Sequence, residues 1–387
     1  MYRRLLLPIY VPSLFSSVSL QALLVLLPLQ VLDRGGSASF AALLIGLRGL
    51  GLLAFDLPVG ILLARLGDKP VLLGGIAAMT ASTALFAFTD NAWIMGVAAF
   101  ASGMGFTAWM IGRQSYITDC SQSSERGRAI SAMAGIMRFG GLIGPVAGAG
   151  IAHAFGYRVA FSLLAISAAI AGLLVLLFAH NARPEQQSAS VHLRRMRQIV
   201  ATHSRVLVSG GVASIGLQLM RSARILLLPL FGHFLGLDIA AIGLIVSLSA
   251  IADAALFYPV GLVMDRYGRK WVSVPCLLLS AISIALLPLA SGYYSLLAVA
   301  SLAGVASGLG SGSLLTLGSD LAPANARHEF LGVWRFVGDL GHAGGPMLIG
   351  TLIELVSLGA ASAATAGIGL ISAAVMYWLV DETLNRD

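Results

Sequence analysis

Long runs without a charged residue alternate with short polar segments along the chain. Leu5–Leu32, Pro70–Thr89, Asn91–Gly112 and Leu355–Val380 are four such runs. Each reaches the roughly 20 residues that a helix needs to cross the hydrocarbon core of a bilayer. The runs are continuously apolar rather than alternating with period two, so they predict membrane-spanning helices and not barrel strands.

The whole pattern predicts an all-α membrane protein with twelve transmembrane helices in two pseudo-symmetric six-helix bundles. We expect an N-terminal bundle over residues 1–180, a cytoplasmic basic linker over 181–205 and a C-terminal bundle over 206–387. The linker is polar and basic, and two forms are open for it: a solvated loop, or a segment that contains a helix lying on the membrane surface. The approximate spans are 6–32, 38–63, 70–89, 92–117, 127–153, 157–180, 206–234, 239–263, 271–290, 293–319, 328–355 and 358–380.

A repeat at an offset of 201 residues supports the two bundles. Pro58-Val59-Gly60 is followed 201 positions later by Pro259-Val260-Gly261, and Gly144-Pro145 by Gly345-Pro346. Proline, glycine and charged matches at one ungapped offset are informative in a chain so rich in Leu and Ala. Two stacked copies of one membrane unit predict a site on the axis between them, near the bilayer midplane.

Composition and charge also indicate a protein that lies in a lipid bilayer. The chain is 58% hydrophobic and 11% charged, whereas soluble domains carry about 25% charged residues. Arg and Lys concentrate in alternate loops and in the linker, which predicts that both termini are cytoplasmic. We expect the protein in the inner membrane. The net charge of +7 then faces anionic lipid, and we expect no nucleic-acid partner.

Enzyme chemistry finds no support in the sequence. Cys120 and Cys276 are the only cysteines, and their spacing indicates neither a disulfide framework nor a metal site. There is no nucleophile elbow and no phosphate-binding loop. We therefore expect no catalytic residue, no cofactor and no metal, and transport that runs on an ion gradient.

Charged residues inside the predicted spans are the strongest functional signal. A central Arg, Lys or Asp costs about 2.5–3.5 kcal/mol on insertion scales, so such groups must face one another, a water-filled cavity or a ligand. Arg335 and Asp339 are four apart and can pair on one helix, with His342 on the same face. Asp253 has no such neighbour. We interpret Asp253, Asp339 and His342 as proton-coupling candidates, with a structural ion pair as the alternative for Arg335 and Asp339.

One loop carries a family resemblance. Gly261–Lys270 matches G-x-x-x-D-R-x-G-R-K, the loop signature of the major facilitator superfamily, and Gly60–Lys69 is a first copy with Ala64 in place of the Asp. The resemblance implies a contact that holds the outward-open state, and the alternative is an ordinary tight turn. The candidate residues of this conformational motif are Gly60, Arg65, Gly67, Gly261, Asp265, Arg266, Gly268 and Arg269.

The predicted span 127–153 carries a second resemblance. Gly140, Gly144 and Gly148 share one helix face and permit close packing, and Pro145 bends the helix. This is similar to the G-x-x-x-G-P motif of antiporters and exporters of the superfamily, specifically its drug and metabolite proton antiporters. The alternative is generic packing of small residues.

Polar residues at four-residue spacing predict the substrate chamber. Ser13, Ser17 and Gln21 share a face of the first span, and Ser214, Gln218 and Ser222 share a face of the seventh. The family's arrangement implies that these spans line a central cavity. Arginines around it would bind a carboxylate or phosphate, unless they pair with Asp residues across helices. The substrate-binding candidates are Ser17, Gln21, Arg48, Arg138, Gln218, Arg221 and Arg224.

The sequence thus predicts a secondary transporter that exports a small amphipathic, anionic organic compound in exchange for protons, by alternating access. Proton-coupled uptake of an organic anion and translocation of a lysophospholipid are the alternatives within transport. A non-transporting membrane receptor is the alternative outside it. The expected partners are a small-molecule substrate, protons and the lipid bilayer, and we expect a monomer.

Overall fold

The structure, a computed structural model, describes residues 5–181, 201–323 and 327–383, without the side chains of residues 123–124, 205–206 and 327–329. The described chain is helical throughout its elements, as the apolar runs predict, and these ranges contain no strand. Most of the predicted linker, including Arg183, Arg194, Arg195 and Arg197, lies outside the described residues.

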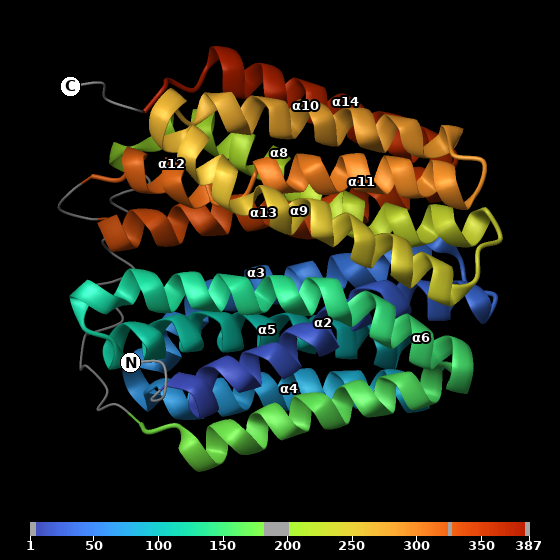
Figure 1. The fold of residues 1–387 in the computed structure, drawn as a ribbon, viewed down its shortest axis with the longest axis horizontal. Helices are drawn as coiled ribbons and strands as arrows, with labels where there is room; N and C mark the ends of the chain where they lie inside the picture. Colours follow the sequence, from blue (N-terminus) through green and yellow to red (C-terminus); the bar gives the residue numbers. More distant parts are fainter. Residues whose placement is uncertain (1–4, 182–200, 324–326, 384–387) are drawn as a thin grey trace. The chain divides into compact units, whose positions relative to one another are not determined.

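The helices of the first half follow the predicted spans closely. A π-helical turn at Leu6–Tyr10 leads into α2 (Val11–Asp33), and α3 (Ala38–Leu66), α4 (Asp68–Phe88) and α5 (Ala92–Cys120) follow. The helix α6 (Ser123–Phe178) carries two predicted spans, separated by a bend at Gly156 with a positive φ of 82°. Figure 1 shows α2, α4 and α6 running side by side in this half, and α6 packs on both α2 and α4.

The second half repeats this order. It comprises α8 (Ser204–Phe234), α9 (Ile239–Tyr267), α10 (Lys270–Leu286), the 3₁₀ turn Leu287–Leu289, α11 (Tyr293–Leu309), α12 (Ser313–Leu321), α13 (Arg327–Leu355) and α14 (Leu358–Trp378). The predicted span 293–319 falls within Tyr293–Leu321, which is long and apolar enough to cross a membrane, but two helices carry it because the helix breaks at Gly310–Gly312. Gly312 has a φ of +79°, a left-handed conformation that favours glycine.

Length and composition make this a multi-pass membrane protein. Ten helices in the described residues are long and apolar enough to cross a membrane. The long α6 counts once among them although it contains two of the predicted spans. The 29-residue α13 is not among the ten, and it contains Arg335, Asp339 and His342.

The chain divides into two compact units. The first comprises Met1–Gln187 with Asp238–Ser247, and the second comprises Ser188–Leu237 with Leu248–Asp387. The start of α9 thus belongs to the first unit, where the backbone N–H of Val146 donates to the Ser247 hydroxyl at 3.0 Å.

Glycines set the closest helix contacts within each unit, and the sequence repeat reappears in them. A Cβ added to Gly103 of α5 would collide with the carbonyl oxygen of Arg48 in α3. A Cβ added to Gly304 of α11 would collide with that of Ser249 in α9. Both pairs are related by the offset of 201. Lipid provides no hydrophobic drive for helix association, so such close backbone approaches gain their stability from van der Waals packing.

The glycine face of α6 lies against α2. A Cβ on Gly140 would collide with Ser17, one on Gly144 would lie 2.6 Å from the Val18 carbonyl oxygen, and one on Gly148 would lie 2.5 Å from the Ala22 Cβ. The equivalent contact in the second unit joins α13 to α8, where a Cβ on Gly345 would lie 2.6 Å from the Ser222 hydroxyl. These glycines therefore allow each pair of helices to touch along its length.

Candidate functional site

An ion pair between neighbouring helices is the centre of the polar residues in the second unit. Arg224 of α8 places Nη1 3.5 Å from Oδ2 of Asp253 in α9. The same carboxylate oxygen accepts a 2.6 Å hydrogen bond from the Ser307 hydroxyl of α11. Arg224 also donates to the Ala303 carbonyl at 3.3 Å and to the Ser249 hydroxyl at 3.4 Å. The two charges are mostly buried, with side chains 16% and 24% exposed.

A second cluster forms one turn earlier along α8. Arg221 donates to the Gly310 carbonyl at 2.7 Å and to the Gln218 side chain at 3.2 Å. Gln218 in turn donates to Asp339 of α13 at 3.1 Å, and Arg335 donates to the other Asp339 oxygen at 3.4 Å. The broken helix between α11 and α12 thus presents the Gly310 carbonyl to the half-buried Arg221, because irregular backbone inside a membrane protein requires a hydrogen-bond partner.

Arg221 and Arg224 both line one small cavity. It has a volume of about 10 Å³ and is lined by both arginines and by Cys276, Ser280, Ser283 and Ser307, with apolar residues around them. This is close to the smallest space that holds one water molecule. Arg224 and Ser307, which contact Asp253, thus share the wall of one cavity with Arg221, which binds the Gly310 carbonyl.

The first unit holds the remaining substrate-binding candidates. Ser17 donates to the Met137 carbonyl at 3.2 Å, and Gln21 lies on the same face of α2, next to the glycine face of α6. Arg138 of α6 donates to the Ala134 carbonyl of its own helix at 3.3 Å. Arg48 of α3 is 3% exposed, and its guanidinium lies 5.1 Å from the centre of the Phe106 ring.

The structure thus brings the candidates together in separate groups. Arg224 contacts Asp253, and Arg221 reaches Asp339 through Gln218. Arg224 therefore pairs with an Asp across helices, one of the two alternatives that the sequence leaves open. His342 is half-buried on α13, three residues beyond Asp339.

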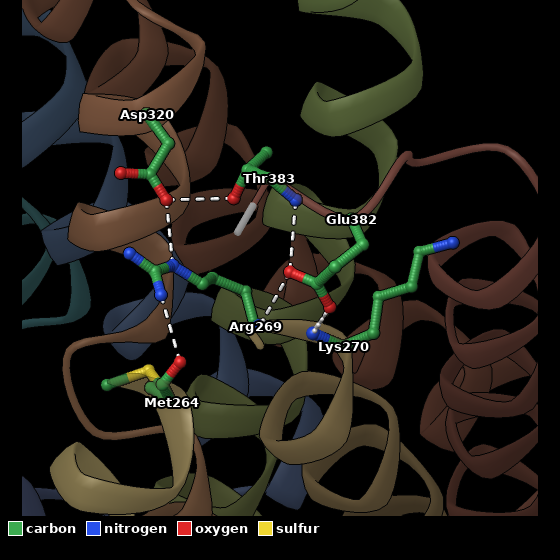
Figure 2. Close-up of polar contacts among 6 residues, drawn as sticks. All are labelled: Met264, Arg269, Lys270, Asp320, Glu382 and Thr383. Atoms are coloured by element: carbon green, nitrogen blue, oxygen red, sulfur yellow. Dashed lines mark hydrogen bonds and ion pairs between the residues drawn. The ribbon is translucent and has the colours of Figure 1, made fainter. Parts of the chain in front are cut away.

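The signature loop of the second unit is organised by the chain segment that follows α14. In Figure 2 the Glu382 carboxylate accepts hydrogen bonds from the backbone N–H groups of Arg269, at 2.8 Å, and Lys270, at 3.1 Å. These groups lie at the start of α10, where a helix has unpaired N–H donors and a positive dipole end. Glu382 therefore caps α10 from a position 112 residues away from Lys270.

Arg269 connects the same loop to α12. Its Nε lies 2.7 Å from Oδ2 of Asp320, which also accepts from the Thr383 hydroxyl at 2.8 Å. Its Nη1 donates to the Met264 carbonyl at the end of α9, at 2.9 Å. Gly268 has a φ of +109°, and a Cβ there would collide with the Glu382 carboxylate. The turn thus requires glycine for two reasons: the positive φ, and the Glu382 carboxylate that occupies the space of a Cβ.

A related cap occurs at the matching position of the first unit. The Asn181 side chain accepts from the backbone N–H of Lys69 at 3.3 Å and donates to the Leu66 carbonyl at 3.2 Å. Lys69 and Lys270 differ by 201, as do Asn181 and Glu382. In both units a side chain from the same repeat position therefore accepts from the N–H groups at this turn, Asn181 in the first and Glu382 in the second. Gly67, like Gly268, has a positive φ, of 81°.

The other motif residues are more exposed. Asp265, Arg266 and Arg65 are exposed, and Asp265 has no ion pair or hydrogen bond to the part of the chain that the structure describes. Gly60 and Gly261 have open space where a Cβ would stand. Asp68 is buried at the start of α4. Its counterpart 201 positions later is Arg269, so the first unit has an acidic residue where the second unit has a basic one.

Several residues of these clusters do not stand out in the sequence. Asn181 and Glu382 differ in type, so the repeat does not reveal them as a pair without the structure. Ser249 and Ser307 are common residues in membrane helices. The closely spaced glycines Gly308, Gly310 and Gly312 are the one signal that could have indicated the break in the tenth span.

Comparison with known proteins identifies the family. The sequence profile described as "Major Facilitator Superfamily" matches residues 10–210 and again 210–386. The multidrug resistance protein MdtH of Yersinia pestis (strain Pestoides F) is 26% identical over 363 residues, which cover 91% of this chain and 88% of the relative. MdtH of Yersinia pseudotuberculosis (serotype O:1b, strain IP 31758) gives the same values.

Solved structures agree in fold. A POT family transporter in complex with a thioalcohol conjugated peptide superposes with a TM-score of 0.80 at 11% identity, over 95% of this chain and 94% of that chain. A D-xylose-proton symporter superposes with a TM-score of 0.77 at 17% identity, over 98% and 97%. With the two profile matches, one over each half, these findings show that the chain belongs to the Major Facilitator Superfamily and is a membrane transporter, not an enzyme.

Proposed function

We propose that this transporter exports a small amphipathic organic anion in exchange for protons, by alternating access. The observation that carries the proposal is the buried pair of Arg224 and Asp253, with the Ser307 hydroxyl on the same carboxylate. A carboxylate and a guanidinium within a membrane span are costly unless each compensates the other. Protonation of Asp253 removes that compensation, so proton binding changes the stability of this helix contact.

Asp339 is the second coupling candidate. It accepts from Gln218 and from Arg335, and Gln218 also binds Arg221. A proton on Asp339 would weaken both contacts and so change the packing of α13 on α8. His342 on the same helix, three residues beyond Asp339, is the third coupling candidate.

The direction of transport is supported by the relatives. Those reported above are named for multidrug resistance, and export is the transport direction that gives resistance. The G-x-x-x-G-P-like face of α6, in tight contact with α2, is a further feature in favour of export.

Uptake together with protons is the second candidate, and the geometry of the Asp253 cluster favours it in one respect. If the anion bound to Arg224, a proton on Asp253 would strengthen that binding, because it would free the guanidinium. Proton and anion would then travel in the same direction. Export therefore requires that the anionic group bind to a cation other than Arg224.

The arrangement in the membrane belongs to the same proposal. We place the protein in the inner membrane as a monomer with both termini cytoplasmic. The Arg and Lys residues of the two signature loops, such as Arg65, Lys69 and Arg269, support this orientation.

Membrane vesicles of known orientation test the proposal. Inside-out vesicles with an acidic lumen should accumulate radiolabelled 2-naphthoate, which serves as a probe for a small amphipathic anion. Passive diffusion of this weak acid runs the other way, toward an alkaline lumen, so vesicles without the protein give the background. Asp253→Asn should abolish the accumulation, while Asp381→Asn, an exposed carboxylate, should not. Accumulation in right-side-out vesicles with an alkaline lumen, above the background, would instead establish uptake.

A further inference from the structure

Arg48 lies deep in the first unit. It stands ten residues after Ala38, the first residue of α3, which corresponds to about 15 Å along a helix. That is half of a hydrocarbon core of about 30 Å. The residue is only 3% exposed, so little bulk water reaches its charge.

The guanidinium of Arg48 has an unused edge. Its Nε and Nη2 are buried and have no hydrogen-bond partner among the residues that the structure describes. These two nitrogens form the side edge of the guanidinium, where both N–H bonds point the same way and match the two oxygens of a carboxylate. The guanidinium carbon lies over the Phe106 ring, 5.1 Å from the ring centre, so an aromatic surface is in contact with the same guanidinium.

The sequence repeat explains why Arg48 lacks a partner. Its counterpart 201 positions later is Ser249, a member of the Arg224 and Asp253 cluster. In the first unit Leu23 stands in place of Arg224, Leu52 in place of Asp253 and Phe106 in place of Ser307. Leu23 and Leu52 are both buried. The second unit thus holds an ion pair at this position, and the first unit holds one cation with an aromatic ring.

An uncompensated buried cation is strongly destabilising, so its retention indicates a ligand that supplies the missing charge. We propose that Arg48 and Phe106 form the subsite for the anionic head of the transported compound, an aromatic or conjugated acid whose carboxylate takes the Nε and Nη2 edge. This inference rests on the proposed function. It names the substrate class and provides the cation other than Arg224 that export requires.

Binding to the purified full-length protein in nanodiscs tests the subsite without transport. The probes are 2-naphthoate, its neutral amide 2-naphthamide and 2-naphthylmethylammonium, measured by calorimetry against empty nanodiscs. The wild type should bind the acid most tightly. In Arg48→Met the dissociation constant for the acid should rise roughly 100-fold, while the weak binding of the amide stays unchanged. In Arg48→Lys the dissociation constant for the acid should rise about tenfold, because an ammonium group keeps the charge but lacks the two parallel N–H donors of the guanidinium edge.

Arg113→Met is the matched control. Arg113 is a buried arginine of the same unit, 6.0 Å from the Trp109 ring, and it donates to the Met137 sulfur at 3.0 Å. The variant Arg113→Met should leave acid binding unchanged. Arg48→Met should also unfold at the same temperature as the wild type or higher, since it removes an unpaired buried charge. Equal acid binding by wild type and Arg48→Met would overturn the subsite, as would failure of the wild type to prefer the acid over the amide.

The two proposals fail differently. Arg48-dependent binding of the acid without proton-linked movement in vesicles would refute the proposed function and leave the subsite intact. Proton-linked transport of 2-naphthoate that Arg48→Met does not alter would support the function and refute the subsite.

Discussion

The guanidinium of Arg224 and the carboxylate of Asp253 lie 3.5 Å apart on α8 and α9, and a 2.6 Å hydrogen bond from Ser307 of α11 fixes the carboxylate. Three helices therefore meet through one ion pair. Since each charge is about four-fifths buried, we expect that neutralising either one weakens the contact among the three helices.

Removing one charge of this pair should destabilise the protein more than removing both. Asp253→Leu leaves Arg224 without its partner and should cost about 1–3 kcal/mol of unfolding free energy, given the partial exposure of both groups. The double variant Arg224→Leu with Asp253→Leu copies Leu23 and Leu52 of the first unit and should recover most of the loss. Thermal unfolding of the single and double variants measures the coupling. Additive losses would show that the two side chains do not act as a pair.

Loss of the cap on α10 should loosen the signature loop. Glu382→Ala leaves the N–H groups of Arg269 and Lys270 without their acceptor and should cost about 0.5–2 kcal/mol. Hydrogen exchange of these two amides should accelerate. The neighbouring Asp381→Ala is the control, because Asp381 is exposed and has no hydrogen bond among the described residues. Equal exchange rates in both variants would argue against the cap.

The glycines of the signature motif should differ in tolerance. Gly268→Ala should cost about 1–2 kcal/mol, because φ is +109° and a Cβ would collide with Glu382. Gly261→Ala should be neutral or slightly stabilising, because Gly261 lies inside α9 with open space around it. Thermal unfolding of both variants separates the two roles. Equal effects would mean that the left-handed turn is not required.

The glycine face of α6 allows a similar comparison. Gly144→Ala would place a Cβ 2.6 Å from the Val18 carbonyl oxygen and should cost about 1–3 kcal/mol through overpacking. Gly150→Ala on the same helix meets nothing within 4 Å and should have no adverse effect. If transport rates fell in Gly144→Ala at a temperature where the protein remains folded, the α2 contact would also bear on conformational change. An unfolding temperature equal to that of Gly150→Ala would contradict the close contact.

The sequence anticipates most of the fold and only part of the site. Charge-free runs and the 201-residue offset predict the helices well, because lipid permits few other structures. The break at Gly310–Gly312 escapes this reasoning, since apolar residues continue through it and its carbonyl is satisfied by Arg221 from another helix.

Pairing between helices is the part that the sequence cannot supply. Arg221 and Arg224 are three residues apart, yet one donates to the Gly310 carbonyl and to Gln218, and the other contacts Asp253. Such choices depend on the rotation of each helix about its axis. The sequence also does not reveal that Glu382 caps α10. Lys270, which donates to Glu382, lies 112 positions before it, and Asn181, the counterpart of Glu382 in the repeat, is uncharged.

Proton movement measured directly in proteoliposomes gives the sharpest test of the account. The lumen contains the pH indicator pyranine, potassium and valinomycin clamp the membrane potential, and 2-naphthoate is added outside. Proton exchange predicts that the lumen becomes more alkaline, which passive entry of the acid cannot produce, and that Asp253→Asn abolishes this signal. Acidification beyond that of protein-free liposomes, or no difference from them, would contradict export coupled to protons.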